Sequence, residues 1–557
     1  MAFLSVVDRW FSLAEEPMVA FRSKKAGVWN AMTFAESVAQ TKGLAAELRR
    51  RGVGIDDRVV LLAAASPEWV VADFAIMSVG ATTVPLATNQ TQGLLRRVIE
   101  EVKPVLILSD DEALLDALEV PKAQRLLVKG RWEFSIEGEG TGPHPSAPDQ
   151  SASILYTSGT TQDAKGVVLT HQNLAHQCET VATMLSLAKG DEQLFLLPLP
   201  HIFGRVVALV AAVSGVTTAF TDSFASAMED VATLEPNILA SVPRFFEKFR
   251  EASMRAADAG GPVKRGVFDW AIRVGRAPIS DSMSFLQRVE RESAKQTILQ
   301  PLRKKMGRRV RLLVSGGAPL DEDVYDFFAA LGMPVLNGYG LTETTGPITL
   351  STPTHHRRGS VGRAVDGANL SFGADGEIRV KGPMVMQRYF PSDVPAGSPR
   401  DPNEGMLSDD GTLSTGDLGK MDSDGFVYVT DRKKEVIVTA GGKKISPAKV
   451  EEVLRRSPNI ELAMVVGEGE RFLGALLVPS EALLKRVSDP AEIQGTLQLD
   501  VDLANRGLEP HERVRKFCFV QAPFSVATGE LSGTLKLRRA VVAEKHRALL
   551  AELFVAT

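Results

Sequence analysis

Apolar residues recur in two rhythms along the part of the chain that precedes Ser371. Stretches with helical spacing, such as 33–52 with Gly52 after the last turn, alternate with short aliphatic runs, such as 58–64 and 104–110. Helical spacing predicts amphipathic helices, and short aliphatic runs predict buried strands. Regular alternation of the two predicts helices layered on a sheet, the arrangement of an α/β domain.

Three later segments place turns rich in glycine and hydroxyl residues directly after predicted strands. The run 151–156 enters the first turn, and a helical stretch with Thr170 as its expected N-cap follows, so this turn is predicted to join a strand to a helix. The segments 308–332 and 334–346 repeat the order of buried strand, Gly-rich turn and helix or loop. Each turn should emerge at the carboxyl end of a strand, where open α/β sheets bind ligands.

After Ser371 the pattern changes to short strands and turns, with little helix before 446–457. There Ser446 is the expected N-cap and Pro447 the first helical residue. The run 462–479 then has the pattern of a strand pair. This part of the chain therefore predicts a β-rich region followed by a small α+β domain.

These patterns divide the chain into a large N-terminal domain over 1–430, a hinge over 431–434 and a small C-terminal domain over 435–557. The predicted fold class is α/β. Layered α/β subdomains and a β-rich subdomain form the large domain, and the C-terminal domain is a separate α+β unit of ordinary size. A chain of 557 residues is too long for one ordinary core, which agrees with this division.

Composition and charge narrow the classes of protein that fit. Hydrophobic residues make up 44% of the chain and charged residues 24%, the balance of a folded globular protein rather than a disordered or fibrous one. A formal net charge of −4 gives no overall basic field for a nucleic acid. A phosphorylated ligand is therefore expected to be small and to meet local cations.

The sequence gives no signal for export and no apolar run of membrane-spanning length. Asp8 and Arg9 place charges at the N-terminus before an apolar stretch can reach the length of a signal-peptide core. Cys178 and Cys518 lack the spacing of a disulfide framework or a zinc site. The longest apolar run, 206–220, is shorter than the roughly 20 residues that a membrane-spanning helix needs. We expect a cytoplasmic protein without a transmembrane segment, and peripheral membrane contact stays an open alternative.

The first of the three Gly-rich turns carries the most specific chemistry of the chain. It reads YTSGTTQDAKG over 156–166, where Gly159 would let the backbone approach an anion, hydroxyl residues supply donors and Lys165 adds a positive charge. This composition predicts a cradle for a polyphosphate. A P-loop is not indicated, because Ala164 and Gly166 stand where that motif needs Gly before the lysine and a hydroxyl residue after it.

Five stretches in a fixed order resemble the acyl-adenylate-forming superfamily, which includes acyl-CoA synthetases, adenylation domains of peptide synthetases and luciferases. They are YTSGTTQDAKGVVLTH (156–171), SGGAPLD (315–321), NGYGLTETTG (337–346), STGDLG with DRKKEVIVTAGGKKISP (414–419 and 431–447), and GTLKLRR (533–539). The resemblance spans nearly the whole chain. The first stretch departs from the family pattern at Gln162, where glycine is usual, and at Ala164, where proline is usual.

The resemblance implies a binding site for ATP. To the ATP phosphates it assigns Thr157, Ser158, Gly159, Thr160, Thr161 and Lys165. For the adenine it implies Gly317, Ala318 and Tyr339. For the ribose hydroxyls it implies Asp417, with Arg432 as a ribose or phosphate partner.

The resemblance also implies how the reacting groups are arranged. Thr342 would contact the α-phosphate, Glu343 would hold Mg²⁺, and Lys536 would reach from a mobile C-terminal domain to the acyl carboxylate and the α-phosphate. Lys434 falls on the hinge about which that domain swings between two half-reactions. After the swing coenzyme A, as co-substrate, would meet Gly441, Gly442 and Lys443.

The stretches 196–210, 234–249 and 267–276 resemble the long-chain fatty acyl-CoA synthetase branch, and this likeness places His201 near the carboxylate end of the acyl pocket. The implied enzyme is a long-chain fatty acid:CoA ligase that forms acyl-AMP and pyrophosphate and then the CoA thioester. Two alternatives stay open. One is an enzyme that delivers the acyl group to the pantetheine of a carrier protein, and the other is a non-catalytic nucleotide- or lipid-binding relative.

Overall fold

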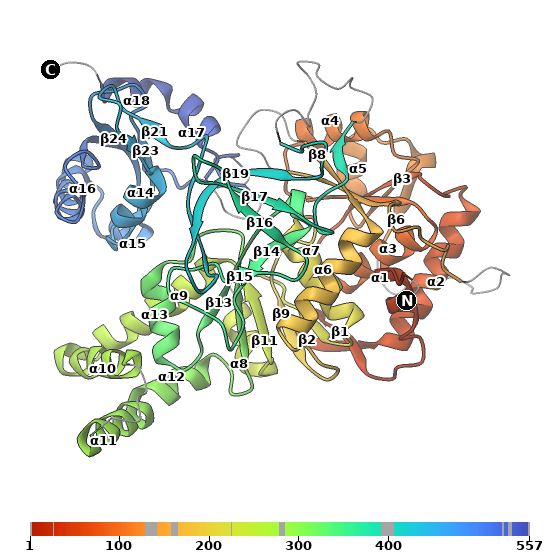
Figure 1. Ribbon diagram of the computed structural model, residues 1–557, viewed down its shortest axis with the longest axis horizontal. Coiled ribbons are helices and arrows are strands. Elements are labelled where there is room, and N and C mark those ends of the chain that lie inside the picture. The colour runs from red at the N-terminus through yellow and green to blue at the C-terminus, as the bar shows by residue number, and fades with distance from the viewer. Residues whose placement is uncertain are drawn as a thin grey trace.

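The computed structural model describes residues 3–25, 27–128, 142–157, 165–223, 226–277, 284–391, 406–525, 528–532 and 537–554. Figure 1 shows a large body built from most of the chain and a smaller C-terminal unit, drawn in blue, attached to one side of it. The predicted α/β fold class with a separate C-terminal domain is confirmed.

One sheet of the large body has the order β18-β8-β7-β4-β3-β5-β6 and parallel pairing at its centre. Its strands are β3 (Arg58–Leu62), β4 (Thr82–Leu86), β5 (Leu106–Ser109), β6 (Arg125–Leu127), β7 (Ser151–Tyr156), β8 (Gly166–Thr170) and β18 (Arg388–Phe390). The strands β3 and β4 are almost completely buried, as expected for parallel strands that are covered on both faces.

A second sheet has the order β15-β14-β13-β12-β11-β9-β10-β1-β2. Its strands are β1 (Val19–Lys25), β2 (Val28–Thr33), β9 (Glu192–Phe195), β10 (Thr217–Phe220), β11 (Ile238–Ser241), β12 (Leu312–Ser315), β13 (Val335–Leu341), β14 (Gly346–Leu350) and β15 (Arg363–Ala364). The strands β10, β9, β11, β12 and the first half of β13 pair in parallel, so their carboxyl ends meet at one edge.

Helices separate the two sheets and cover their outer faces. One apolar core joins both sheets to the helices α1 (Val6–Phe11), α2 (Phe34–Arg50), α3 (Pro67–Ser78), α6 (His171–Met184) and α7 (Ile202–Val213). The outer face of the first sheet carries α4 (Gln92–Val102) and α5 (Glu112–Ala117). The second sheet carries α8 (Ala227–Leu234), α9 (Pro243–Asp258), α10 (Gly261–Arg276), α11 (Phe285–Ala294), α12 (Gln300–Lys305) and α13 (Glu322–Ala330).

One prediction about the Ser/Thr-rich turn is wrong. The turn leads from β7 into β8, which pairs antiparallel with β7, and not directly into a helix. The reason is the aliphatic run Val167 to Leu169, which is fully buried and favours an extended strand. The helix α6 begins only after this strand, where the N–H of Asn173 donates to Thr170 Oγ1 at 3.2 Å and confirms the predicted N-cap.

The β-rich region and the C-terminal unit have the predicted secondary structure, short strands followed by a mixture of helices and strands. The β-rich sheet contains β16 (Asn369–Phe372), β17 (Glu377–Lys381), β19 (Leu413–Met421) and β20 (Val427–Arg432). The C-terminal strands are β21 (Ile437–Val438), β22 (Lys444–Ile445), β23 (Ile460–Val466), β24 (Leu473–Pro479) and β25 (Val514–Phe519). Its helices are α14 (Pro447–Arg455), α15 (Glu481–Arg486), α16 (Pro490–Asn505), α17 (Arg539–Lys545) and α18 (Arg547–Glu552).

The C-terminal unit has an apolar core of its own. The predicted N-cap Ser446 is confirmed, because its Oγ accepts from the N–H of Lys449 at 3.2 Å. The predicted strand pair is also confirmed as the antiparallel pair of β23 and β24.

Within the described ranges, no helix combines the length and the apolar character needed to cross a bilayer. The apolar run 206–220 is divided between α7 and β10 by a turn. Both cysteines are free thiols, Cys178 buried and Cys518 half-buried.

Candidate functional site

A cleft of 3540 Å³ receives side chains from both sheets of the large body, from the β-rich sheet and from the C-terminal unit. Many of the residues that the sequence singles out line it: Thr157, His201, Gly317, Ala318, Tyr339, Thr342, Glu343, Asp417, Arg432 and Lys434. Segments far apart in the sequence thus meet at the carboxyl edge of the second sheet, where open α/β sheets bind ligands.

Asp417 connects two sheets at the wall of this cleft. Its carboxylate is buried, Oδ2 accepts from the hydroxyl of Tyr339 at 2.8 Å, and Oδ1 accepts from Arg432 Nε at 3.1 Å. Arg432 stands directly opposite Asp417 across β19 and β20, so strand register aligns the pair. Each carboxylate oxygen keeps a second lone pair, so Asp417 can accept hydrogen bonds from two hydroxyls of a ligand.

Burial, followed by the charge of the Asp417 carboxylate, raises the pKa of Tyr339 above its usual range. Its hydroxyl therefore stays protonated and acts as a donor at neutral pH. The glycines around Tyr339 were expected to form a turn. Instead β13 continues through them and pairs antiparallel with β14, so Tyr339 lies within a strand. The close approach of the two strands requires glycine at 340, where a Cβ would lie 1.8 Å from the carbonyl oxygen of Gly346.

Thr342 and Glu343 lie on the short 3₁₀ turn η3 (Thr342–Thr344) that follows β13. The carbonyl of Glu343 accepts from the N–H of Met386 at 2.8 Å, and its Oε1 accepts from the hydroxyl of Tyr389 at 2.8 Å. Burial and the Glu343 carboxylate raise the pKa of Tyr389, so this hydroxyl also remains a donor. The backbone and the side chain of Glu343 are therefore both held in place by hydrogen bonds.

Glu343 fits the way in which proteins hold Mg²⁺ together with a nucleotide. In the part of the chain that the structure describes, no group of three His, Cys, Asp or Glu side chains could hold a metal by itself. Mg²⁺ is commonly held by one or two carboxylates plus phosphate oxygens and water. One oriented carboxylate at the cleft is compatible with that arrangement.

The two ends of the Ser/Thr-rich turn are described. The N–H of Thr157 donates to the carbonyl of Lys165 at 3.0 Å, which closes the turn at its base. Lys165 Nζ lies 4.9 Å from the ring centroid of Tyr389, a cation–π geometry. The predicted phosphate contacts Ser158, Gly159, Thr160 and Thr161 lie outside the described residues.

The proposed adenine slot contains an aromatic ring that the sequence did not indicate. A Cβ on Gly316 would lie 3.3 Å from the ring of Phe203, so only glycine leaves this ring undisturbed. Gly317 has φ +82° and adopts the left-handed conformation that glycine accepts without strain. The glycines therefore let the backbone pass close to Phe203 at the cleft.

His201 stands at the first turn of α7. Its Nδ1 accepts from the N–H of Phe203 at 3.3 Å, so the ring caps the helix while it lines the cleft. This capping contact is a structural role for the ring, alongside its predicted place near the acyl carboxylate.

Buried apolar residues also line the cleft, and we refer to this part of its lining as the apolar channel. Its walls are aliphatic side chains that are nearly inaccessible to solvent and still line the cavity: Leu185, Val206, Val210, Ile238, Ala240 and Val314. A Cβ on Gly346 would lie 3.5 Å from Val206 Cγ2, which places Val206 beside the turn that carries Glu343. Val210 lies four residues further along α7, a rise of about 6 Å.

The C-terminal unit supplies the opposite wall. Leu531 and Leu537 form an antiparallel bridge, and both line the cleft together with Arg538. These residues flank the segment that carries Lys536, which itself lies outside the described residues. Gly441, Gly442 and Lys443 form the exposed turn between β21 and β22 and do not line the cleft.

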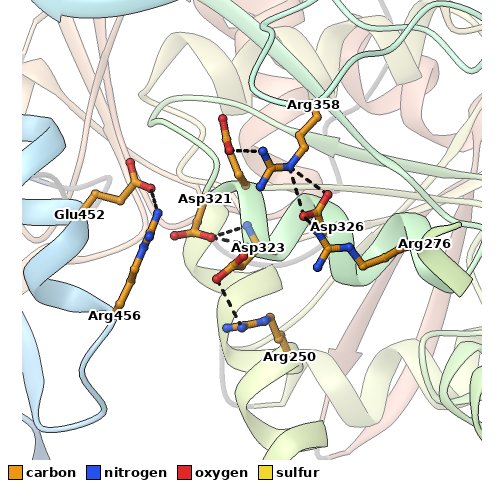
Figure 2. A network of polar contacts seen from close by, with 10 residues as sticks. Arg250, Arg276, Asp321, Asp323, Asp326, Arg358, Glu452 and Arg456 are labelled. Carbon is orange, nitrogen blue, oxygen red and sulfur yellow. Dashed lines mark hydrogen bonds and ion pairs between the residues drawn. The ribbon is translucent and has the colours of Figure 1, made fainter. Parts of the chain in front are cut away.

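Charged side chains face one another where the two domains meet. Figure 2 shows Asp321 of the large domain beside Glu452 of α14 and Arg456, which directly follows that helix, whereas Asp323 and Asp326 lie further from them. Arg456 pairs with Glu452 at 3.3 Å, and Arg250 lies 3.9 Å from Asp323. Burial, followed by the negative charge of Asp321, raises the pKa of Glu452.

Two residues of this site were missed from the sequence, Tyr389 and Phe203. Tyr389 contacts Glu343, which lies 46 positions earlier in the sequence, and no local motif predicts that contact. Phe203 follows His201 in a run that reads as ordinary helix. Only the folded arrangement identifies either residue.

Comparison with known proteins gives two matches to family models. A model described as "AMP-binding enzyme" matches residues 14–390, and one described as "AMP-binding enzyme C-terminal domain" matches residues 434–556. Long-chain-fatty-acid–CoA ligase FadD15 of Mycobacterium bovis is 34% identical over 93% of this chain and 91% of its own length. Long-chain-fatty-acid–CoA ligase ACSBG2 of Rattus norvegicus is 27% identical over 95% of this chain and 89% of its own.

Solved structures agree at the level of fold. ATP-bound MatB from Rhodopseudomonas palustris has a TM-score of 0.72 at 24% identity, covering 98% of this chain and 99% of its own. O-succinylbenzoate coenzyme A synthetase (MenE) from Bacillus subtilis, in complex with ATP and magnesium, has a TM-score of 0.70 at 24% identity. It covers 95% of this chain and 98% of its own.

Proposed function

The chain belongs to the AMP-binding enzyme family, and from that premise we propose that it is an AMP-forming long-chain fatty acid:CoA ligase. The observation that carries the proposal is the junction of a polar wall and a buried apolar channel at Gly346. Glu343 and Asp417 lie on the polar side, and Val206 opens the apolar side. A ligand with a long alkyl chain and a carboxylate head fits such a junction. Close relatives that are named long-chain-fatty-acid–CoA ligases support this substrate class.

The polar wall is proposed to bind ATP. Asp417 would accept the ribose hydroxyls, Arg432 would hold the ribose or a phosphate, and Tyr339 would flank the adenine with Gly317 and Ala318. The Ser/Thr-rich turn from Thr157 to Lys165 would surround the departing pyrophosphate. Mg²⁺, held by Glu343 and phosphate oxygens, would supply positive charge there.

Attack of a carboxylate oxygen on the α-phosphorus brings two anions together. The new oxygen–phosphorus bond forms acyl-AMP, while the bond to pyrophosphate breaks and the leaving group carries its electrons away. The site must therefore offer donors and cations where negative charge builds up. We assign this role to Thr342 and Lys536, with His201 at the carboxylate end of the channel.

In the second half-reaction the sulfur of coenzyme A attacks the acyl carbonyl and AMP leaves. Gly441, Gly442 and Lys443 lie away from the cleft in this structure, so a CoA role requires the C-terminal domain to turn. We propose Lys434 as the hinge residue, because it lines the cleft where the two domains join.

The test is to incubate the protein with ATP, Mg²⁺ and straight-chain acids from acetate to arachidate, with and without coenzyme A. AMP and thioester should form with long acids, and acyl-AMP should accumulate when coenzyme A is withheld. Absence of AMP with every acid would refute the ligase and leave a binding protein. AMP that forms only with a pantetheine-bearing carrier protein would select the carrier-dependent alternative.

A further inference from the structure

The helices α10 and α11 project from the large body, at the lower left of Figure 1. Trp270 Nε1 on α10 donates to Glu290 Oε1 on α11 at 2.7 Å, and a Cβ on Gly275 would lie 3.0 Å from Leu299 Cδ1. These contacts pack α10 against α11 and against the segment that follows α11. The same Gly275 approaches the carbonyl of Ala330 on α13, which places the ends of the helices at the body and their first turns at the tip.

Large apolar side chains are exposed near this tip. Phe285, Leu286 and Val263 are 79%, 77% and 82% exposed, and Val267 and Val289 are exposed as well. On α11 Phe285 and Val289 lie roughly opposite the buried Ala294, and Leu286 lies to one side of it, so this apolar surface faces away from the buried side of the helix. Clustered exposed apolar residues on a protein surface mark an interaction site.

The same segment is strongly basic. Residues 261–309 contain twelve Lys and Arg against four Asp and Glu, a net charge of +8 in a chain whose formal charge is −4. A groove of 900 Å³ runs along α11 and α12 and is lined by Arg288, Arg291, Glu292, Lys295, Arg303, Lys304 and Arg308. Positive charge and exposed apolar surface therefore lie on one extension of the molecule.

We propose that α10 and α11 dock the protein onto a bilayer that contains anionic phospholipid. Apolar side chains at the tip would enter the acyl boundary, while the cations of the groove would remain at the level of the phosphates. Interfacial helices combine apolar and basic surface in this manner. Arg265, Arg276 and Arg308 pair with acids outside this segment, and the remaining excess of cations provides the complementarity to an anionic surface. Electrostatic attraction adds about 1 kcal/mol for each nearby Lys or Arg.

The test is sedimentation with vesicles of phosphatidylcholine alone and of an equimolar mixture of phosphatidylcholine and phosphatidylglycerol, at low and high salt. The full chain should bind the mixed vesicles, bind phosphatidylcholine far more weakly, and lose affinity as salt rises because screening weakens surface attraction. Equal binding to both vesicles, or binding to neither, would overturn the proposal.

Two pairs of variants separate the apolar and electrostatic contributions. Phe285→Ser with Leu286→Ser should lower the partition coefficient at least tenfold, and Leu499→Ser with Leu503→Ser on α16 is the matched control for exposed leucines. Lys295→Gln with Lys304→Gln should lower it about thirtyfold, the equivalent of roughly 1 kcal/mol for each cation. The control for charge is Lys103→Gln with Lys122→Gln, at exposed positions elsewhere.

The thermal midpoints of all four variants should match that of the parent protein, because every substituted side chain is exposed. Controls that lose as much binding as the tip variants would refute the docking surface. The competing occupant is a second copy of the chain. A dimer that forms without lipid and dissociates in the Phe285 and Leu286 variant would also overturn the proposal.

Discussion

The two walls of the cleft are held in place in different ways. On the large-domain side, buried hydrogen bonds fix the carboxylates: Asp417 by Tyr339 and Arg432, and Glu343 by Tyr389. On the other side, the C-terminal domain meets the large domain through charged side chains near the surface. Arg244 pairs with Glu461 at 2.5 Å, with 28% and 42% of the two side chains exposed.

This difference separates a rigid part from an adjustable part. Buried and fully satisfied polar networks impose one geometry, whereas an exposed ion pair contributes about 0–1 kcal/mol. The large-domain wall is therefore organised before a ligand arrives, and the orientation of the C-terminal domain is held weakly. A reaction with two steps at one cleft would use both properties.

The largest effect is expected for Lys536, which the C-terminal domain is proposed to bring to the site. Lys536→Ala should lower acid-dependent formation of AMP by about 100-fold to 1000-fold, because one charge-stabilising group is lost. Thioester formation from supplied acyl-AMP should change only a few-fold. Lys516→Ala, in the same domain, is the control, and an equal loss in both half-reactions would contradict the assigned role.

On the rigid wall, Asp417→Asn should raise the KM for ATP about tenfold or more, since charged acceptors form the stronger hydrogen bonds. Steady-state kinetics with ATP as the varied substrate measure this change. Asp424→Asn on an exposed turn should leave the KM unaltered. An unchanged KM in the Asp417 variant would place the ribose elsewhere.

Two substitutions on α7 would obstruct the apolar channel at different distances from Gly346. Val206→Phe, beside Gly346, should block acids of every length, whereas Val210→Phe should exclude only the longest, because it lies four residues, or about 6 Å, further along α7 from Gly346. Relative kcat/KM across a series of acids distinguishes the two. Identical acid profiles for both variants would show that the alkyl chain does not follow α7.

A smaller effect is expected for Tyr389→Phe, which removes the hydrogen bond to Glu343 and keeps the ring beneath Lys165. The Mg²⁺ concentration needed for half-maximal activity should rise about threefold to tenfold, the equivalent of roughly 1 kcal/mol, which is the net contribution of a typical hydrogen bond. Tyr428→Phe, at a surface aspartate, is the matched control. A fall in kcat without any change in Mg²⁺ dependence would argue for a purely structural role.

The smallest effect should come from the contact between domains. Arg244→Gln should cost less than about 1 kcal/mol of unfolding free energy, since the pair with Glu461 is partly exposed. Denaturant titration measures this cost. Destabilisation of several kcal/mol would mean that the C-terminal domain is fixed rather than adjustable.

The sequence was sufficient for local structure and for much of the site. The N-caps at Thr170 and Ser446 and the alternation of helices and strands were predicted, because they depend on neighbouring residues. The strand β8 was missed, because a run of five residues before a helix gives no clear periodicity. The contact of Tyr339 with Asp417 spans 78 positions and exists only once two sheets have packed together.

A crystal structure with a non-hydrolysable ATP analogue and Mg²⁺ tests the central claim most directly. We predict ribose density against Asp417, phosphate density along the turn from Thr157 to Lys165, and little movement of Tyr339, Asp417 or Glu343. Nucleotide bound outside this cleft, or carboxylates that rearrange to meet it, would contradict the account.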